Sequence, residues 1–221
     1  MNSIPVYFMP GMAASSSIFE RIELPSTTFE VFLLDWVQPE KKETLASYAK
    51  RMAEKVVHEN AVLIGVSFGG ILVQEMASYL NLRKLIIISS VKSRQELPLR
   101  MKWAKATKAY KLLPTSMFEN SEKILQYTFG TVLKQKVKLY EKYLHLQNKD
   151  YLDWAIEQVI CWSREYPDPN VVHIHGDLDE VFPAKNIHSF ISVKGGTHIM
   201  MLMRFRWFNQ HLPDIILNSG N

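Results

Sequence analysis

The 221-residue chain lacks several features that mark particular classes of protein. It has one cysteine, Cys161, so no disulfide can form within the chain, and this composition fits a reducing compartment. No apolar run approaches the roughly 18 residues that a membrane span needs. The first three residues carry no positive side chain, and Pro5 and Pro10 interrupt the apolar stretch that follows, so no secretion signal is expected. We therefore predict a cytoplasmic protein without a transmembrane segment.

Cofactor motifs are also missing. The sequence contains neither a P-loop nor a dinucleotide-binding fingerprint, so no organic cofactor is predicted. Internal repeats, low-complexity tracts and linkers are absent too, and a hydrophobic content of 47% is enough for a substantial core. These observations indicate an ordinary globular domain of enzyme size.

One motif stands out, Gly65-Val66-Ser67-Phe68-Gly69, between the apolar run 61–64 and a helix-like segment 71–80. A serine hydroxyl is a weak nucleophile unless the chain presents it beside a base, and a sharp strand-to-helix turn presents it in this way. Such a turn is strained and brings strand and helix so close that bulky residues two places either side of the serine would clash. Glycine occupies both places, so Ser67 is the candidate nucleophile.

A candidate acid and a candidate base follow in that order. The strand-like segment 171–175 leads into His175-Gly176-Asp177-Leu178-Asp179-Glu180-Val181-Phe182-Pro183, and a second short strand, 190–193, leads into Gly195-Gly196-Thr197-His198. Both stretches resemble the α/β-hydrolase superfamily, whose triads follow the chain order Ser, Asp, His. The resemblance implies a catalytic triad of Ser67, Asp179 and His198. Asp177 is then interpreted as a turn residue that bonds the loop backbone.

The resemblance also implies an oxyanion hole made of two backbone N–H groups. One belongs to Phe68, directly after the nucleophile. The other is assigned to Met12, in the stretch Phe8-Met9-Pro10-Gly11-Met12. Pro10 replaces the histidine that family members usually carry before this glycine, and Gly11 lets the backbone approach a substrate closely.

Strand-like and helix-like segments alternate along the chain. The strands are predicted at 4–8, 29–34, 61–66, 84–89, 171–175 and 190–193. The helices are predicted at 45–58, 71–80, 183–188 and 199–212. Most of the strands are continuous apolar runs, which are typical of a parallel sheet covered on both faces. We predict an α/β protein with a mostly parallel sheet of about six strands flanked by helices, and the resemblance implies the α/β-hydrolase fold with a minimal N-terminus.

Between the fourth and fifth strands lies a long insertion with helical periodicity. In the family, an insertion here forms a helical cap over the nucleophile, so the chain divides into a core, 1–90 and 169–221, and a cap, 91–168. Cap side chains would shape the acyl pocket, or they would simply hold the cap on the core. The candidates are Trp103, Met117, Phe118, Tyr127, Phe129 and Trp154.

Positive charge is concentrated in the same insertion. The chain has a formal net charge of +4, but residues 91–150 hold 13 lysines and arginines against 5 acidic residues. Two sets of lysines recur at helical spacing: Lys134, Lys138 and Lys142, and Lys102, Lys105, Lys108 and Lys111. They form either a solvated face or a surface for an acidic partner. No nucleic-acid motif accompanies them, so an anionic thioester carrier (coenzyme A or an acyl carrier protein) or an acidic membrane surface fits better.

The sequence therefore predicts a serine-dependent acyl hydrolase, a carboxylesterase or thioesterase that acts through an acyl-enzyme intermediate on a small-molecule substrate. One alternative is a ligand-binding homologue with little turnover. Another is a metal-dependent hydrolase, because the segment 173–177 resembles the H-x-H-x-D opening of metallo-β-lactamase-like enzymes. Leu178 stands where those enzymes have their next histidine, and the segment lies late in the chain. We interpret His173 and His175 as structural and predict no metal.

Overall fold

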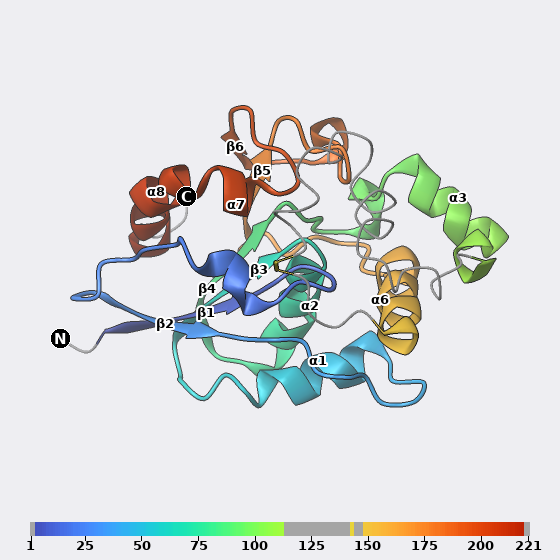
Figure 1. Cartoon of the computed structure of the whole chain (residues 1–221), viewed down its shortest axis with the longest axis horizontal. Coiled ribbons are helices and arrows are strands. Elements are labelled where there is room, and N and C mark those ends of the chain that lie inside the picture. Colours follow the sequence, from blue (N-terminus) through green and yellow to red (C-terminus); the bar gives the residue numbers. More distant parts are fainter. Residues whose placement is uncertain (1–2, 113–141, 144–147, 219–221) are drawn as a thin grey trace.

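A computed structural model describes residues 3–112, 142–143 and 148–218 of the chain (Figure 1). Within these residues six strands form one sheet in the order β2-β1-β3-β4-β5-β6, and each neighbouring pair is parallel. The strands are β1 (Ile4–Met9), β2 (Phe29–Leu33), β3 (Ala61–Val66), β4 (Leu82–Ile88), β5 (Val172–Gly176) and β6 (Ile191–Val193). The predicted six-stranded parallel sheet is confirmed.

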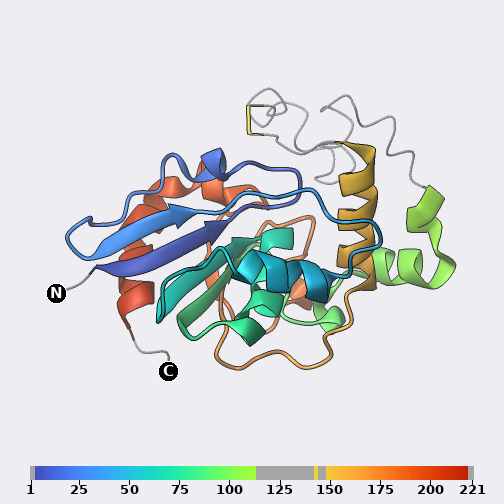
Figure 2. The same cartoon turned by 90° about the horizontal axis from the view of Figure 1, so that it is seen from below.

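Helices cover both faces of the sheet. The described α-helices are α1 (Leu45–Ala53), α2 (Phe68–Met76), α3 (Leu99–Thr107), α6 (Lys149–Cys161), α7 (Met200–Met203) and α8 (Phe205–Leu217). Figures 1 and 2 show α8 on one side of the sheet and α1 with α2 on the other. Figure 2 also shows β1 and β2 pointing toward the end of the molecule where α6 lies, so α6 stands near the carboxyl ends of the strands.

The core explains the sequence pattern. All six residues of β3 are buried, as a central strand covered on both faces requires. Helix α8 buries Phe208, Leu212 and Ile216, which recur at every fourth position and therefore share one face. Full burial of each such side chain contributes about 1.5–3 kcal/mol, so this single stripe holds α8 on the sheet.

All four predicted helices have different bounds in the structure. The helix expected at 71–80 begins at Phe68, directly after Ser67, and ends at Met76, where the 3₁₀ turn Ala77–Tyr79 follows. The helix expected at 45–58 ends at Ala53, because the N–H groups of Lys55 and Val56 bond carbonyls only three residues back and close the last turn. The helix expected at 199–212 is divided at Arg204 into α7 and α8, and α8 continues past Pro213. The segment expected at 183–188 holds only a three-residue 3₁₀ turn, Ala184–Asn186.

Two described helices, α3 and α6, lie in the predicted insertion 91–168 and contact each other. The rest of this insertion includes 113–141 and 144–147, which fall outside the described residues. The division into core and cap therefore stays a prediction. In the part of the chain that the structure describes, no helix has the length and apolar character needed to cross a membrane.

Candidate active site

Ser67 stands alone between the last residue of β3 and the first residue of α2. Its backbone has φ 53° and ψ −120°, a region that residues other than glycine rarely adopt. Two hydrogen bonds hold this conformation: the Ser67 N–H donates to the Ile88 carbonyl at 2.9 Å, and the Ser90 hydroxyl donates to the Ser67 carbonyl at 2.8 Å. The strained turn is therefore fastened to the neighbouring strand β4.

Glycine is required on both sides of this turn. A Cβ atom added to Gly65 would lie 2.4 Å from the Gly69 carbonyl oxygen. One added to Gly69 would lie 2.3 Å from the Pro10 carbonyl oxygen, at the end of β1. Both distances are far shorter than any van der Waals contact, so strand, helix and the loop after β1 pack backbone against backbone here. The expected clash at the two glycine positions is confirmed.

Three side chains form a continuous hydrogen-bonded chain. His198 Nε2 lies 2.9 Å from Ser67 Oγ, and His198 Nδ1 lies 2.9 Å from Asp179 Oδ2. An ionised carboxylate can only accept hydrogen bonds, so Nδ1 carries the imidazole proton and Nε2 is free to accept from the serine hydroxyl. His198 and Asp179 are 6% and 4% exposed, so solvent competes little for these bonds. The structure thus brings together the three residues predicted as a triad.

The two aspartates of the acidic loop have different partners. Asp179 Oδ1 accepts from the N–H groups of Val181 and Phe182 at 2.8 and 2.9 Å, which fixes the carboxylate against the imidazole. Asp177 instead accepts from the Gly195 N–H at 2.6 Å and so joins the two loops. The predicted turn role of Asp177 agrees with this contact.

His173 and His175 lie behind the acid loop. His175 Nε2 lies 2.8 Å from the Phe182 carbonyl and must donate to it, so His175 Nδ1 accepts from His173 Nε2 at 3.2 Å. Burial lowers the pKa of His175, and it lowers the pKa of His173 well below the usual histidine range. Both rings are therefore neutral and bonded within the core. Among the described residues, no group of three or more His, Cys, Asp or Glu side chains is placed to hold a metal ion.

These depressed pKa values predict that acid destabilises the fold. Both histidines have a pKa of about 6.5 in the unfolded chain, so below that pH the unfolded chain binds protons that the folded chain does not, and the free energy of unfolding falls as pH falls. The replacement His173→Gln keeps a side-chain N–H for His175 and removes one of the two titrations. Urea unfolding from pH 7.5 to 5 should then show a shallower pH dependence in the variant than in the wild type. Identical slopes would contradict this assignment.

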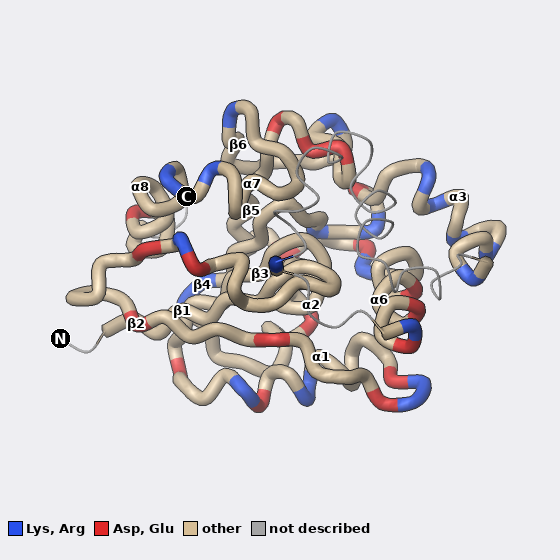
Figure 3. Tube along the Cα trace, in the orientation of Figure 1, with Lys and Arg blue, Asp and Glu red and all other residues tan. Residues whose placement is uncertain are grey.

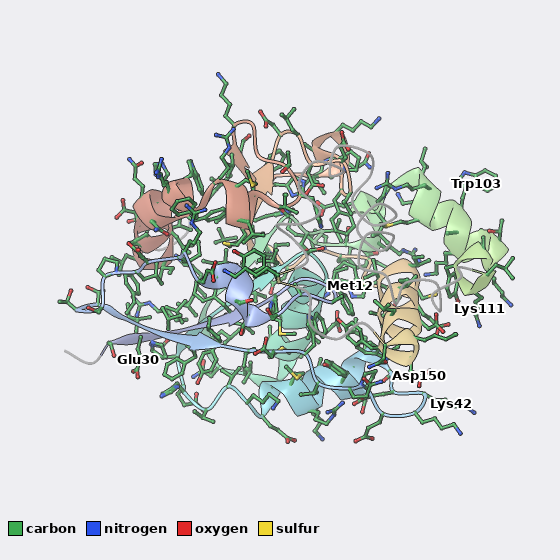
Figure 4. All side chains as sticks on the ribbon, in the orientation of Figure 1. Met12, Glu30, Lys42, Trp103, Lys111 and Asp150 are labelled. Atoms are coloured by element: carbon green, nitrogen blue, oxygen red, sulfur yellow. The ribbon has the colours of Figure 1, made fainter. Side chains whose placement is uncertain are left out.

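The two predicted oxyanion donors belong to residues next to Ser67 in the chain and next to Gly11 in the loop after β1. Phe68 is the first residue of α2, and neither its N–H nor that of Met12 has a protein acceptor among the described residues. A Cβ atom added to Gly11 would lie 3.4 Å from Ser67 Cβ and 4.0 Å from Ser67 Oγ, so the loop after β1 passes directly beside the hydroxyl. Figure 4 labels Met12 near the middle of the view.

An aromatic cluster that the sequence did not reveal lies next to these donors. The Trp36 and Phe68 rings are stacked, with centroids 4.8 Å apart and planes at 10°. Tyr151 from α6 meets the edge of Trp36 at 5.7 Å, and Trp154 meets the edge of Phe68 at 5.8 Å. Trp36 follows β2 and so lies at the carboxyl edge of the parallel sheet. Its place after a predicted strand was the sequence signal for a residue near the site.

The predicted pocket residues fall into three groups. Trp154 is 8% exposed, and its indole N–H donates to the Glu43 carbonyl at 2.7 Å, so it joins α6 to the turn before α1. Trp103 is 68% exposed at the outer edge of α3, and the structure does not bring it to Ser67 (Figure 4). The remaining candidates lie outside the described residues: Met117, Phe118, Tyr127 and Phe129.

Of the predicted basic stripe 134, 138 and 142, only Lys142 is described, and it pairs with Glu20 at 2.8 Å. The second lysine set lies on α3 and the 3₁₀ turn that follows it, shown as blue segments in Figure 3. Lys102 and Lys105 donate to the backbone carbonyls of Gln95 and Cys161 at 2.7 and 3.2 Å. Such bonds hold the ammonium groups without neutralising them.

Comparison with family models gives no match, and comparison with curated protein sequences gives none either. Comparison with solved structures gives several matches that cover nearly the whole chain. A hydrolase from Pseudomonas aeruginosa PA01 is 17% identical with a TM-score of 0.73, and the match covers 98% of this chain and 91% of that one. A thermophilic esterase from Thermogutta terrifontis is 14% identical with a TM-score of 0.71, covering 97% and 90%. The enol-lactonase from Burkholderia xenovorans LB400 is 13% identical with a TM-score of 0.68, covering 99% and 93%.

Proposed function

We propose, from the premise that this chain has the α/β-hydrolase fold, that it is a serine-dependent acyl hydrolase acting on a carboxylic ester or thioester. The fold alone does not choose a reaction, because one fold supports many chemistries. The observation that carries the proposal is the hydrogen-bonded chain from Ser67 Oγ through His198 to Asp179, on a strained turn. The N–H of Phe68, the residue after Ser67, and the N–H of Met12, the residue after Gly11, have no acceptor among the described residues.

These groups suit a two-step acyl transfer. Ser67 Oγ attacks the substrate carbonyl carbon while His198 Nε2 takes the hydroxyl proton, and Asp179 stabilises the resulting imidazolium. The carbonyl oxygen becomes an oxyanion that accepts from the Phe68 and Met12 N–H groups. The bond to the alcohol or thiol then breaks as His198 returns the proton to that leaving group. Water attacks the acyl-enzyme with His198 as base, which releases the acid and restores the Ser67 hydroxyl.

Covalent labelling and turnover together test this proposal. The wild-type protein is treated with a fluorophosphonate, and hydrolysis is measured for p-nitrophenyl esters and acyl-coenzyme A thioesters of increasing acyl length. We expect labelling at Ser67 and steady-state turnover that a chelator does not change. Labelling without turnover of any member of the series would favour the ligand-binding alternative. Loss of activity on chelation, restored by zinc, would favour the metal-dependent one.

The proposal extends to the leaving group. The segment 97–112, which contains α3, carries five cationic side chains and no acidic one. Its lysines at 102 and 105 are exposed and are held by carbonyl oxygens, so their charge remains available to an anionic ligand. A phosphate-bearing or acidic thioester carrier has the complementary charge. Coenzyme A thioesters and acyl carrier protein are therefore the carriers proposed for this surface.

Charge reversal on α3 tests the carrier. The double change Lys102→Glu with Lys105→Glu should lower kcat/KM for an acyl-coenzyme A about tenfold at low salt, because exposed charges mainly steer association within a field screened over about 10 Å at 0.1 M salt. A p-nitrophenyl ester of the same acyl group should be hydrolysed as before. The control is Lys50→Glu with Lys55→Glu. These two exposed lysines lie in α1 and just after it, and their replacement changes the net charge of the protein by the same amount. If the two double variants lower kcat/KM for acyl-coenzyme A equally, the lysines of α3 are only a solvated surface and do not recognise the carrier.

A further inference from the structure

Trp36 is tied to the loop that carries the second candidate oxyanion donor. This side chain is 2% exposed, and its indole N–H donates to the Gly11 carbonyl oxygen at 2.7 Å. The same oxygen also accepts from the Ala14 N–H at 3.1 Å. Two donors therefore fix the direction of one carbonyl group beside Ser67.

The Gly11 carbonyl and the Met12 N–H belong to the same peptide unit. The described backbone contains no cis peptide, and in a planar trans peptide the C=O and N–H point in opposite directions. Whatever holds the Gly11 carbonyl therefore also aims the Met12 N–H. We propose that Trp36 is a positioning residue for the oxyanion hole, which aims the Met12 N–H at the developing oxyanion; this rests on the proposed acyl hydrolysis.

The same ring also contacts the other donor residue. Trp36 stacks on the Phe68 side chain, at 4.8 Å between centroids and 10° between planes, and the Phe68 N–H is the first donor. An indole is rigid, so it sets a fixed distance between the residue after the nucleophile and the loop after β1. Electrostatic stabilisation of an oxyanion requires this kind of preorganisation, because both donors must already point at the oxygen as charge develops.

Tyr151 anchors the far side of the same loop. Its hydroxyl accepts from the Ala13 N–H at 3.2 Å, and Ala13 has φ 59°, a left-handed conformation that needs such support. Tyr151 is fully buried, and burial raises its pKa well above the ordinary tyrosine value, so the hydroxyl stays neutral. Met12 thus lies between two anchored neighbours, Gly11 held by Trp36 and Ala13 held by α6.

The size of the effect follows from what each change removes. Deleting an oxyanion donor outright lowers kcat about 10²–10³-fold in well-studied enzymes, and Trp36→Phe leaves the Met12 N–H in place but poorly aimed. We therefore expect a loss in kcat of about tenfold to a hundredfold, with KM changed less than about twofold, because the donor acts mainly on the transition state. Tyr151→Phe removes one oxygen and keeps the ring, so its loss should be smaller, about threefold to tenfold.

The experiment compares these variants with a matched control. Trp162→Phe removes another buried indole N–H, which donates at 3.0 Å to Oε1 of Glu75, near the C-terminal end of α2. For each protein we would measure kcat and KM on p-nitrophenyl butyrate, Ki for a trifluoromethyl ketone of matching chain length, and Tm. The ketone forms a tetrahedral adduct whose oxyanion occupies the hole. Its Ki should therefore rise in Trp36→Phe by about the factor by which kcat falls, whereas Trp162→Phe should lose Tm alone.

The outcomes separate this inference from the proposed function. Absence of turnover and of Ser67 labelling in the wild type would refute the hydrolase proposal, and this inference with it. An active wild type with kcat and Ki unchanged in Trp36→Phe would leave the hydrolase intact and show that Trp36 only supports the fold. If Trp36→Phe does not fold, the test rests on Tyr151→Phe. A fall in kcat with a matching rise in Ki would support the inference that anchoring of the loop after β1 positions the Met12 N–H. Unchanged kcat and Ki in Tyr151→Phe would overturn it.

Discussion

Replacing Ser67 with alanine is expected to abolish fluorophosphonate labelling and to lower kcat on the order of 10⁶-fold, as loss of the nucleophile does in a well-studied serine hydrolase. The reason is the position of Ser67 Oγ, 2.9 Å from His198 Nε2 on the strained turn between β3 and α2. Residual hydrolysis would come from substrate binding and the two N–H donors alone. Mass spectrometry of the labelled protein and steady-state kinetics measure the two effects.

A second serine gives the matched control. Ser89, just beyond β4, is fully buried, and its hydroxyl has no partner among the described residues. Ser89→Ala should retain labelling and kcat close to wild type. Both variants should keep Tm within a few degrees, which separates lost chemistry from lost folding. Labelling that persists in Ser67→Ala and disappears in Ser89→Ala would overturn the assignment of the nucleophile.

Much of the sheet could be read from the sequence because burial on both faces makes its strands continuous apolar runs. The prediction for 61–66 coincides with β3, whose residues are all buried. The predicted strand 84–89 starts two residues later than β4, because the exposed, charged Arg83 separates Leu82 from the apolar run. Local pattern thus finds the centre of a strand better than its exposed end.

Helical periodicity was a weaker guide to what a helix face contacts. Trp103 recurs at helical spacing with Ala106 and Tyr110, yet α3 has no buried side chain and Trp103 is largely exposed. Helical periodicity in a sequence shows which residues share one face of a helix. Whether that face is buried depends on how other segments of the chain pack against it. The pocket prediction that included Trp103 depended on this missing information.

The residues of the candidate site also fall into two groups, those that a local motif predicts and those that only the packing of the chain brings together. Ser67, Asp179 and His198 could be predicted because each lies in a loop with its own local motif, and parallel strands bring such loops to one edge of the sheet. The bonds from Trp36 to Gly11 and from Tyr151 to Ala13 have no local motif. They depend on how the loop after β2 and a distant helix pack, which a single sequence does not encode in any short pattern.

Replacing Asp179 with asparagine is expected to lower kcat on the order of 10⁴-fold, because it imposes the wrong histidine tautomer. The structure dictates how the new amide would orient. Oδ1 accepts from two backbone N–H groups, at Val181 and Phe182, so the amide oxygen must remain there. The amide NH₂ then takes the place of Oδ2, which at 2.9 Å is nearer to His198 Nδ1 than Oδ1 at 3.1 Å, and donates to that nitrogen. That moves the imidazole proton to Nε2, where it blocks removal of the serine proton.

Asp177 offers the control for this prediction, two residues away in the same loop. Its Oδ1 accepts from the Gly195 N–H at 2.6 Å, a bond that an asparagine oxygen makes equally well. Asp177→Asn should therefore change kcat by less than about threefold, since it keeps the acceptor and loses only a charge that does not contact the imidazole. Activity of Asp179→Asn should also recover partly at alkaline pH, where hydroxide can remove the Nε2 proton. Equal losses in the two variants, or a larger loss at Asp177, would assign the acid to the other aspartate.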